Sequence, residues 1–104
     1  MIRFDVDTAA RTLRCLFCGH LDTATCQSIM PMLEEQLDAV VRPGTVDTVV
    51  FDLAQVNFIP SAFIRLCMTT AKRLSPGRFS IVNTDATIKR TFKIAGLDQL
   101  LRVS

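Results

Sequence analysis

The stretch VDTVVFDL at residues 46–53 is the feature that most constrains the fold of this chain. It is β-branched and mostly apolar, which is typical of a strand covered on both faces of a sheet. The loop AQVNFIPS follows it, and then AFIRLCMTTAKRL at 62–74 carries apolar residues at helical spacing. Because a buried strand followed by a helix is the unit of parallel sheets, we expect 46–53 to be the central strand of an α/β domain.

The N-terminal segment predicts a β-hairpin. Apolar residues occupy every second position of IRFDVD at 2–7 and of TLRCLFC at 12–18. An alternation of this kind has the period of a strand. The polar stretch DTAAR between the two segments supplies the turn.

The segment SIMPMLEEQLDAVV at 28–41 predicts a helix whose first residue the sequence leaves open. If Ser28 is the N-cap, Pro31 falls in the first turn and removes no hydrogen bond; if the helix begins near Thr23, Pro31 must kink it. RPG at 42–44 ends the helix. Apolar residues at four-residue spacing form its stripe: Ile29, Leu33, Leu37 and Val41.

The C-terminal part predicts one more strand, RFSIVN at 78–83, and one more helix within TDATIKRTFKIAG at 84–96. Thr84 or Asp85 is suited to cap the start of that helix, and Gly96 followed by Leu97 is suited to end it. The predicted order is β-β-α-β-α-β-α. We therefore expect an α/β fold with a mixed, mostly parallel sheet and helices packed on it, as one domain spanning 1–104.

Composition excludes several classes of function. A net charge of +2 is too small for a dedicated nucleic-acid binder. No run approaches the roughly 18 apolar residues of a membrane span, and the N-terminus lacks the pattern of a signal peptide. We expect a cytoplasmic protein without direct membrane insertion and without a cofactor.

The four cysteines and the single histidine do not form an evident catalytic or metal site. Cys15 and Cys18 lie three apart on a predicted strand, so their side chains should point to opposite faces. Cys26 and Cys67 do not repeat the spacing of a zinc motif, and we expect all four thiols to be reduced and buried. His20 is best interpreted as a surface turn residue, so we predict neither a catalytic residue nor a metal ligand.

Ser61 is the candidate functional residue. It follows a buried strand by way of a loop, at the edge of a sheet where α/β proteins bind ligands, and it stands at the start of a helix. The simplest interpretation is an N-cap whose side chain accepts a first-turn N–H. A phosphate at the same place would be favoured by the helix dipole and would add nearly two negative charges to the surface.

The chain contains, in this order, GHLD at 19–22, a strand–loop–helix segment at 49–66, FSIVN at 79–83 and IAGLDQLL at 94–101. Together these segments resemble the STAS domain of sulfate transporters and bacterial anti-sigma factor antagonists. GHLD at 19–22 is similar to the family's Gly-x-Leu-Asp, and VVFDLAQVNFIPSAFIRL at 49–66 is similar to its strand, loop and helix. FSIVN at 79–83 and IAGLDQLL at 94–101 are similar to its last strand and closing segment. The resemblance implies the same β-β-α-β-α-β-α order.

The resemblance also implies a role for Ser61. In the family, a loop of the form Asp-Ser-Ser-Gly or Asp-Ser-x-Gly carries a serine that is phosphorylated by a partner kinase, itself the anti-sigma factor. In this chain Ser61 matches that serine, whereas Pro60, Ala62 and Phe63 replace the flanking aspartate, serine and glycine. These replacements remove a negative charge and fill space beside the hydroxyl, which favours binding that does not depend on phosphorylation.

The leading hypothesis is a non-catalytic bacterial regulator that binds an anti-sigma kinase or related protein and is switched by phosphorylation of Ser61. Arg65 would meet an acidic partner or pair with Asp22. The alternative is a constitutive subunit of a stressosome-like particle or a transporter complex. The sequence gives little support to an enzyme that uses His20 or the cysteines. It also gives little support to nucleotide binding, because no Gly-rich phosphate loop is present. The predicted partner-binding residues are Asp22, Asn57, Pro60, Ala62, Phe63 and Arg65.

Overall fold

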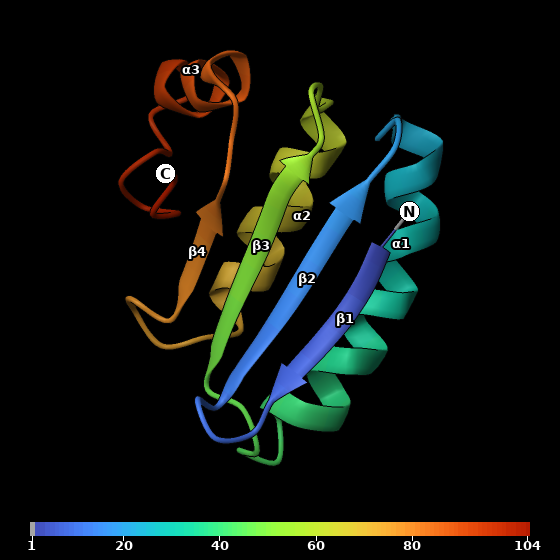
Figure 1. Ribbon diagram of the computed structural model, residues 1–104, viewed down its shortest axis with the longest axis vertical. Helices are drawn as coiled ribbons and strands as arrows, with labels where there is room; N and C mark the ends of the chain where they lie inside the picture. Colours follow the sequence, from blue (N-terminus) through green and yellow to red (C-terminus); the bar gives the residue numbers. More distant parts are fainter. Residues whose placement is uncertain (1) are drawn as a thin grey trace.

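The computed structural model describes residues 2–104 and has the predicted order of elements (Figure 1). A short π-helical segment, η1, extends the first helix. The elements are β1 (Ile2–Asp7), β2 (Thr12–Cys18), α1 (Thr23–Gln36), η1 (Leu37–Val41), β3 (Thr48–Gln55), α2 (Ser61–Lys72), β4 (Phe79–Val82) and α3 (Ala86–Ile94).

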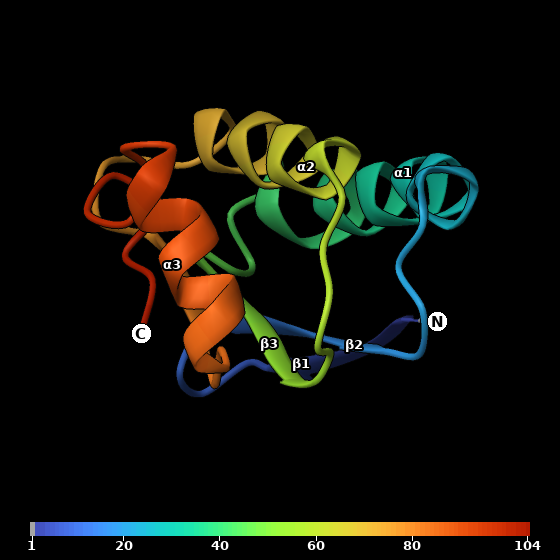
Figure 2. The same cartoon turned by 90° about the horizontal axis from the view of Figure 1, so that it is seen from above.

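The four strands form one sheet in the order β1-β2-β3-β4. β1 and β2 are antiparallel, with Phe4 opposite Cys15, whereas β2–β3 and β3–β4 are parallel. The predicted mixed, mostly parallel sheet is therefore confirmed. α1 and α2 lie side by side on one face of the sheet, and α3 lies beyond the carboxyl end of β4 (Figures 1 and 2).

The prediction that 46–53 is a strand covered on both faces is wrong in two respects. The strand is shifted to Thr48–Gln55, and helices cover only one face of the sheet (Figure 2). Val49 and Phe51 are fully buried beneath the helices, but Val50 is half-buried on the open face. The two central strands also carry an ion pair on the open face, in which the Asp52 side chain is buried and the Arg14 side chain is partly exposed. The apolar composition of 46–53 did not reveal that face.

The ion pair joins β2 to β3 on the open face. Arg14 donates from Nε and Nη2 to one carboxylate oxygen of Asp52, at 3.2 and 2.7 Å. The other oxygen accepts hydrogen bonds from the Ala54 N–H and the Asn83 side chain. Burial acts to raise the pKa of Asp52, but these three donors outweigh it and lower that pKa below its usual value.

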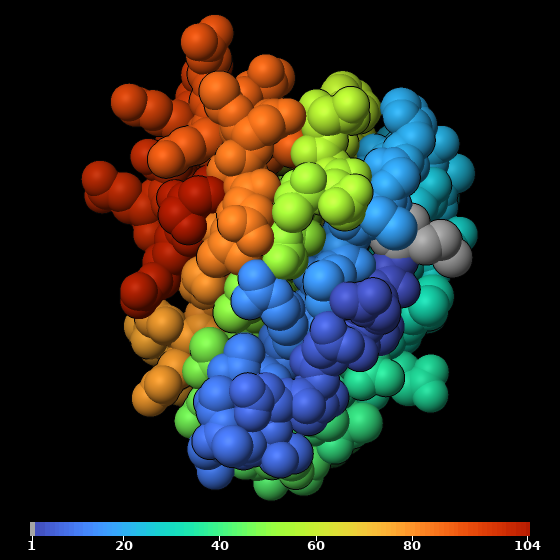
Figure 3. Space-filling model, in the orientation of Figure 1, coloured from blue at the N-terminus to red at the C-terminus, as the bar shows by residue number. Residues whose placement is uncertain are grey.

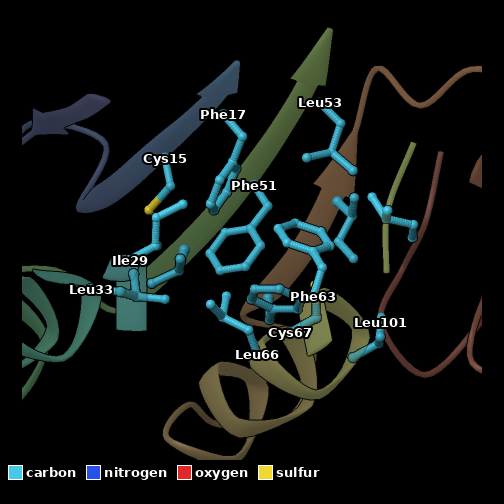
Figure 4. Packing of buried hydrophobic residues seen from close by; sticks show 14 of the residues in the cluster. Cys15, Phe17, Ile29, Leu33, Phe51, Leu53, Phe63, Leu66, Cys67 and Leu101 are labelled. Atoms are coloured by element: carbon cyan, nitrogen blue, oxygen red, sulfur yellow. The ribbon is translucent and has the colours of Figure 1, made fainter. Parts of the chain in front are cut away.

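The core lies between the helix layer and the inner face of the sheet (Figure 4). Phe17 packs edge-on against Phe51 and Phe63, with ring centroids 4.8 and 5.1 Å apart. Phe79 meets Phe51 in the same way at 4.9 Å. The helices contribute buried side chains at helical spacing, namely Ile29, Leu33 and Leu37 from the first helix and Phe63, Leu66, Cys67 and Thr70 from the second.

The first helix begins at Thr23, so Pro31 lies inside it and Ser28 is not its cap. Asp22 is the N-cap, and its Oδ1 accepts the Thr25 N–H at 2.7 Å. The hydroxyl of Ser28 instead donates to the carbonyl of Ala24. Pro31 is tolerated because it is exposed, and the carbonyl that its missing N–H would have bonded can be hydrated.

The C-terminal segment confirms the predicted caps of the last helix. Asp85 caps α3 by accepting the Ile88 N–H at 2.8 Å, and Gly96 has φ of +73° at its end. Gly96 and Leu97 donate their N–H groups to the carbonyls of Lys93 and Phe92, respectively, which is the pattern of a Schellman cap.

Within residues 2–104, no helix is long and apolar enough to cross a membrane.

Candidate functional site

A polar cleft of about 460 Å³ opens at the carboxyl ends of β2 and β3. Its walls are the turn after β2, the end of β3 with the segment that follows it, and the capping residue of α3. Beside it, the rings of His20 and Phe58 stack with centroids 5.9 Å apart and planes 10° apart. This contact joins the loop after β2 to the loop before α2, and Phe58 is 52% exposed. The lining residues are Gly19, His20, Ala54, Gln55, Val56, Asn57 and Asp85.

Two buried residues anchor the loop between β3 and α2. Val56 and Ile59 are buried, whereas Asn57 and Phe58 are exposed. Val56 also donates its N–H to the carbonyl of Leu53, which turns the chain at the end of β3. Val56 and Ile59 therefore hold the loop against the core, and Asn57 and Phe58 are displayed to solvent between them.

Ser61 is exposed and is the first residue of α2, so the prediction that it is the N-cap is wrong. Pro60 occupies the cap position with extended dihedral angles, φ −85° and ψ 168°, and it has no side-chain acceptor. Among residues 2–104, the Ser61 hydroxyl has no hydrogen-bond partner, and the N–H groups of Ser61 and Ala62 have no acceptor. The site therefore offers a bare hydroxyl and unpaired N–H groups at the positive end of a helix.

Phe63 has no exposed area, because it packs against Phe17 beneath the start of α2. The prediction that Phe63 takes part in partner binding is corrected accordingly: a side chain without accessible surface offers no contact to a partner. Its position, where the resembling family has glycine, is part of the core here. Ile64, the next residue, is half-buried.

A second hollow, the α1–α2 groove, runs between the N-terminal halves of these helices and measures about 280 Å³. Ala62 and Arg65 form part of its α2 wall, so two predicted binding residues border it. Arg65 is exposed and forms no ion pair within the described part of the chain, so the predicted alternative of a pair with Asp22 is not formed. The groove is lined by Thr23, Cys26, Gln27, Met30, Pro31, Ala62, Arg65 and Leu66.

Asp22 lies at the same end of the molecule, one residue before the groove-lining Thr23. The hydrogen bond from the Thr25 N–H lowers the pKa of the Asp22 carboxyl, and the nearby His20 lowers it further. Asp22 is therefore ionised at neutral pH and exposed, although its Oδ1 is committed to the cap.

The cysteines are unsuited to nucleophilic chemistry where they are buried. Burial raises the pKa of the Cys15 thiol to about 12, and burial raises that of Cys67 well above its usual value. Burial, and then the charge of Asp22, raise the pKa of Cys26. Cys18 is exposed, which corrects the expectation that all four would be buried, and it points away from Cys15 as the strand period predicts. No cluster of His, Cys, Asp or Glu suited to a metal ion occurs in residues 2–104.

The sequence interpretation placed Ser61, Asn57 and Arg65 at one surface but missed Phe58 and the groove. An exposed phenylalanine cannot be recognised from its sequence position, because apolar residues in a loop are usually buried anchors. The groove depends on how closely two helices pack, which no local pattern fixes.

The fold is a mixed four-stranded sheet with two helices on one face and an exposed loop-to-helix junction at its carboxyl edge. The STAS domain family model matches residues 9–104, and the chain therefore belongs to the STAS domain family. Curated protein sequences gave no match.

Solved structures share the fold at low sequence identity. The anti-sigma factor antagonist SpoIIAA in its unphosphorylated form is 19% identical, with a TM-score of 0.79 over all of this chain and 88% of that one. The Bacillus cell fate determinant SpoIIAA in its phosphorylated form is also 19% identical, with a TM-score of 0.72 over all of this chain and 91% of that one. The protein TM1081, solved by NMR, is 12% identical, with a TM-score of 0.69 over all of this chain and 80% of that one.

Proposed function

We propose that this chain is a non-catalytic regulatory domain that binds a protein partner through one surface, the Ser61 surface. This surface begins at the polar cleft, crosses the start of α2 and ends in the α1–α2 groove. Its exposed members are Asp22, Asn57, Phe58, Ser61 and Arg65, with half-buried Pro60 and Ala62 between them.

The observation that carries the proposal is the state of Ser61. Its hydroxyl is exposed on a loop that buried residues hold in place, and it stabilises nothing within residues 2–104. A hydroxyl with no structural task is available for modification or for contact with a partner. The fold is shared with a protein whose phosphorylated and unphosphorylated forms have both been solved.

Phosphorylation of Ser61 would act on binding through charge. The new phosphate would sit at the positive end of α2, where the unpaired N–H groups of Ser61 and Ala62 and the helix dipole favour it. It would also change the charge of a surface on which the Arg65 side chain forms no ion pair within residues 2–104. A partner that meets Arg65 with a carboxylate would then be repelled by the phosphate or lose Arg65 to it.

The experiment compares four forms of the tagged chain in capture from native cells, followed by reconstitution with each purified captured protein. We expect a specific partner to bind the wild type and Ser61→Ala but to be lost by Ser61→Asp. Ser75→Asp is the matched control, because Ser75 is an exposed serine just beyond the opposite end of α2. It should bind like the wild type.

A partner that binds Ser61→Asp as tightly as the wild type would contradict the switch. That outcome would favour the second candidate function, a constitutive subunit of a larger assembly. Pro60 and the buried Phe63 support this candidate, since both replace small or acidic residues beside the serine of the resembling family. Arg65→Ala, tested in the same reconstitution, separates the surface from the switch: its loss of binding would support the surface even where Ser61→Asp binds like the wild type.

A further inference from the structure

The two edges of the sheet differ in whether another part of the chain pairs with them. At the β4 edge, the C-terminal segment adds a parallel bridge between Ile81 and Val103, and Ser104 donates its N–H to the carbonyl of Ile81. At the β1 edge, β2 is the sole pairing strand among residues 2–104. In Figure 3 the dark-blue atoms of β1 lie uncovered on the face shown. An uncovered edge strand presents unpaired N–H and C=O groups that can template pairing with another strand.

Charges on the outer face of β1 form one end of an alternating row. Asp52 on β3 pairs with Arg14 on β2, and Arg14 stands directly opposite Asp5 on β1. Asp5 is also within 3.6 Å of Arg3 on its own strand, and both side chains are more than half exposed. A further strand carrying a positive charge opposite Asp5 would continue the row.

The sequence of β1 is self-complementary in one antiparallel register. If a twofold axis passes beside Phe4, Arg3 of each copy stands opposite Asp5 of the other, and Ile2 stands opposite Val6. Moving the axis to Asp5 or to Arg3 instead sets two like charges opposite each other, which destabilises a cross-strand pair. Among the symmetric registers centred on Arg3, Phe4 or Asp5, the charges of β1 therefore favour the one centred on Phe4.

Exposed apolar side chains lie along the same edge. Val6 is 44% exposed at the end of β1, and Met32 on α1 is 40% exposed. Because successive helical residues turn by about 100°, Met32 lies on the flank of α1 opposite to Met30, which faces the α1–α2 groove. Since α1 lies on the β1 side of the helix layer (Figures 1 and 2), that flank overhangs the β1 edge.

We propose that the β1 edge binds a second copy of this chain, with the two β1 strands paired antiparallel about a twofold axis at Phe4. The pairing joins the two sheets into one and brings the two α1 flanks, with Met32, next to each other. It uses an edge distant from Ser61, so it stands independently of the proposed function.

Charge exchange tests the register. Sedimentation velocity at low salt, over a wide range of protein concentration, should show the wild type forming dimers. Asp5→Arg should weaken dimerisation by about ten-fold or more, because it replaces two attractive cross-strand pairs by repulsive ones. The double variant Arg3→Asp/Asp5→Arg restores opposite charges across the axis and should dimerise again.

The mixture of two single variants provides the sharpest comparison. Arg3→Asp and Asp5→Arg should each be largely monomeric alone and should form a heterodimer when mixed, because one carries only acidic and the other only basic charges at these positions. Circular dichroism checks that every variant is folded. A wild type that stays monomeric at all concentrations would overturn the proposal and make the charges of β1 a protection against pairing. A dimer that Asp5→Arg leaves unchanged would also overturn it, since a different surface would then hold the copies together.

Discussion

The start of α2 differs from the starts of α1 and α3, although all three helices follow loops at the same edge of the sheet. Asp22 and Asp85 each precede their helix and accept a first-turn N–H, at 2.7 and 2.8 Å. α2 instead follows Pro60, which has no side-chain acceptor, and the hydroxyl of its first residue, Ser61, makes no hydrogen bond within residues 2–104.

The difference shows where this chain relies on packing rather than on capping. α2 is held by Phe63 and its buried neighbours directly beneath its first turn, whereas its polar start contributes little to stability. Because buried side chains hold the start of α2 in place, its exposed residues can be modified or bound without unfolding the helix. Such a division is suited to a site that is modified or bound.

The largest expected effect is the loss of that anchor. Phe63→Ala should lower the free energy of unfolding by about 3–5 kcal/mol, because it removes a fully buried ring between Phe17 and the rest of the core. Phe63→Leu, which keeps most of the volume, is the control and should cost less than about 1.5 kcal/mol. Urea unfolding measures both, and a loss below about 1 kcal/mol for Phe63→Ala would mean that another contact anchors α2.

Removing a true cap should have a smaller effect. Asp85→Ala should cost about 1 kcal/mol of unfolding free energy, because the Ile88 N–H loses its acceptor. The same urea experiment measures it. Asp85→Asn retains an acceptor and should stay near the wild-type value; equal losses in both variants would assign the effect to charge rather than to the cap.

The cap of α1 should also appear in the pH dependence of stability. The pKa of Asp22 is lowered in the folded state, so the unfolded chain binds its proton first as the pH falls. The contribution of Asp22 is present above its unfolded pKa and is lost as the pH falls through the folded value. Stability measured across the acidic range should therefore fall less steeply in Asp22→Asn than in the wild type, and identical slopes would contradict this role.

The smallest effect is expected at Ser61. Ser61→Ala should change the free energy of unfolding by less than about 0.5 kcal/mol, because the hydroxyl has no hydrogen-bond partner to lose in the described part of the chain. Comparison with Asp85→Ala under the same conditions is the decisive contrast. A cost near that of Asp85→Ala would mean that Ser61 caps α2 after all.

Local patterns predicted most of the elements because their signals are local. The alternation in 2–7 and 12–18 and the apolar stripes of the helices each report one buried face, and the observed strands β1 and β2 have those bounds. The first residue of α1 could not be predicted, because Asp22 favours a start at Thr23 whereas Pro31 disfavours a helix that contains it. In the structure Pro31 is exposed, and the helix begins at Thr23.

Other features depend on contacts between distant residues and could not be read from the sequence. The open face of the sheet was missed because Val50 is apolar like its buried neighbours. Ser61 was predicted as a cap from its residue type, but the cap position falls one residue earlier, on Pro60. Within the candidate site, the burial of Phe63 followed from long-range packing against Phe17.

The central claim is that Ser61 is a site of regulation and not of stability. Intact-mass spectrometry of the chain purified from its native cells, with and without stress, tests it most directly when the wild type and Ser61→Ala are compared. We predict a species heavier by one phosphate in the wild type, in at least one condition, that is absent from Ser61→Ala. A chain that is never modified, or a phosphate that persists in Ser61→Ala, would contradict the claim and leave Ser61 as an exposed residue at the start of a helix.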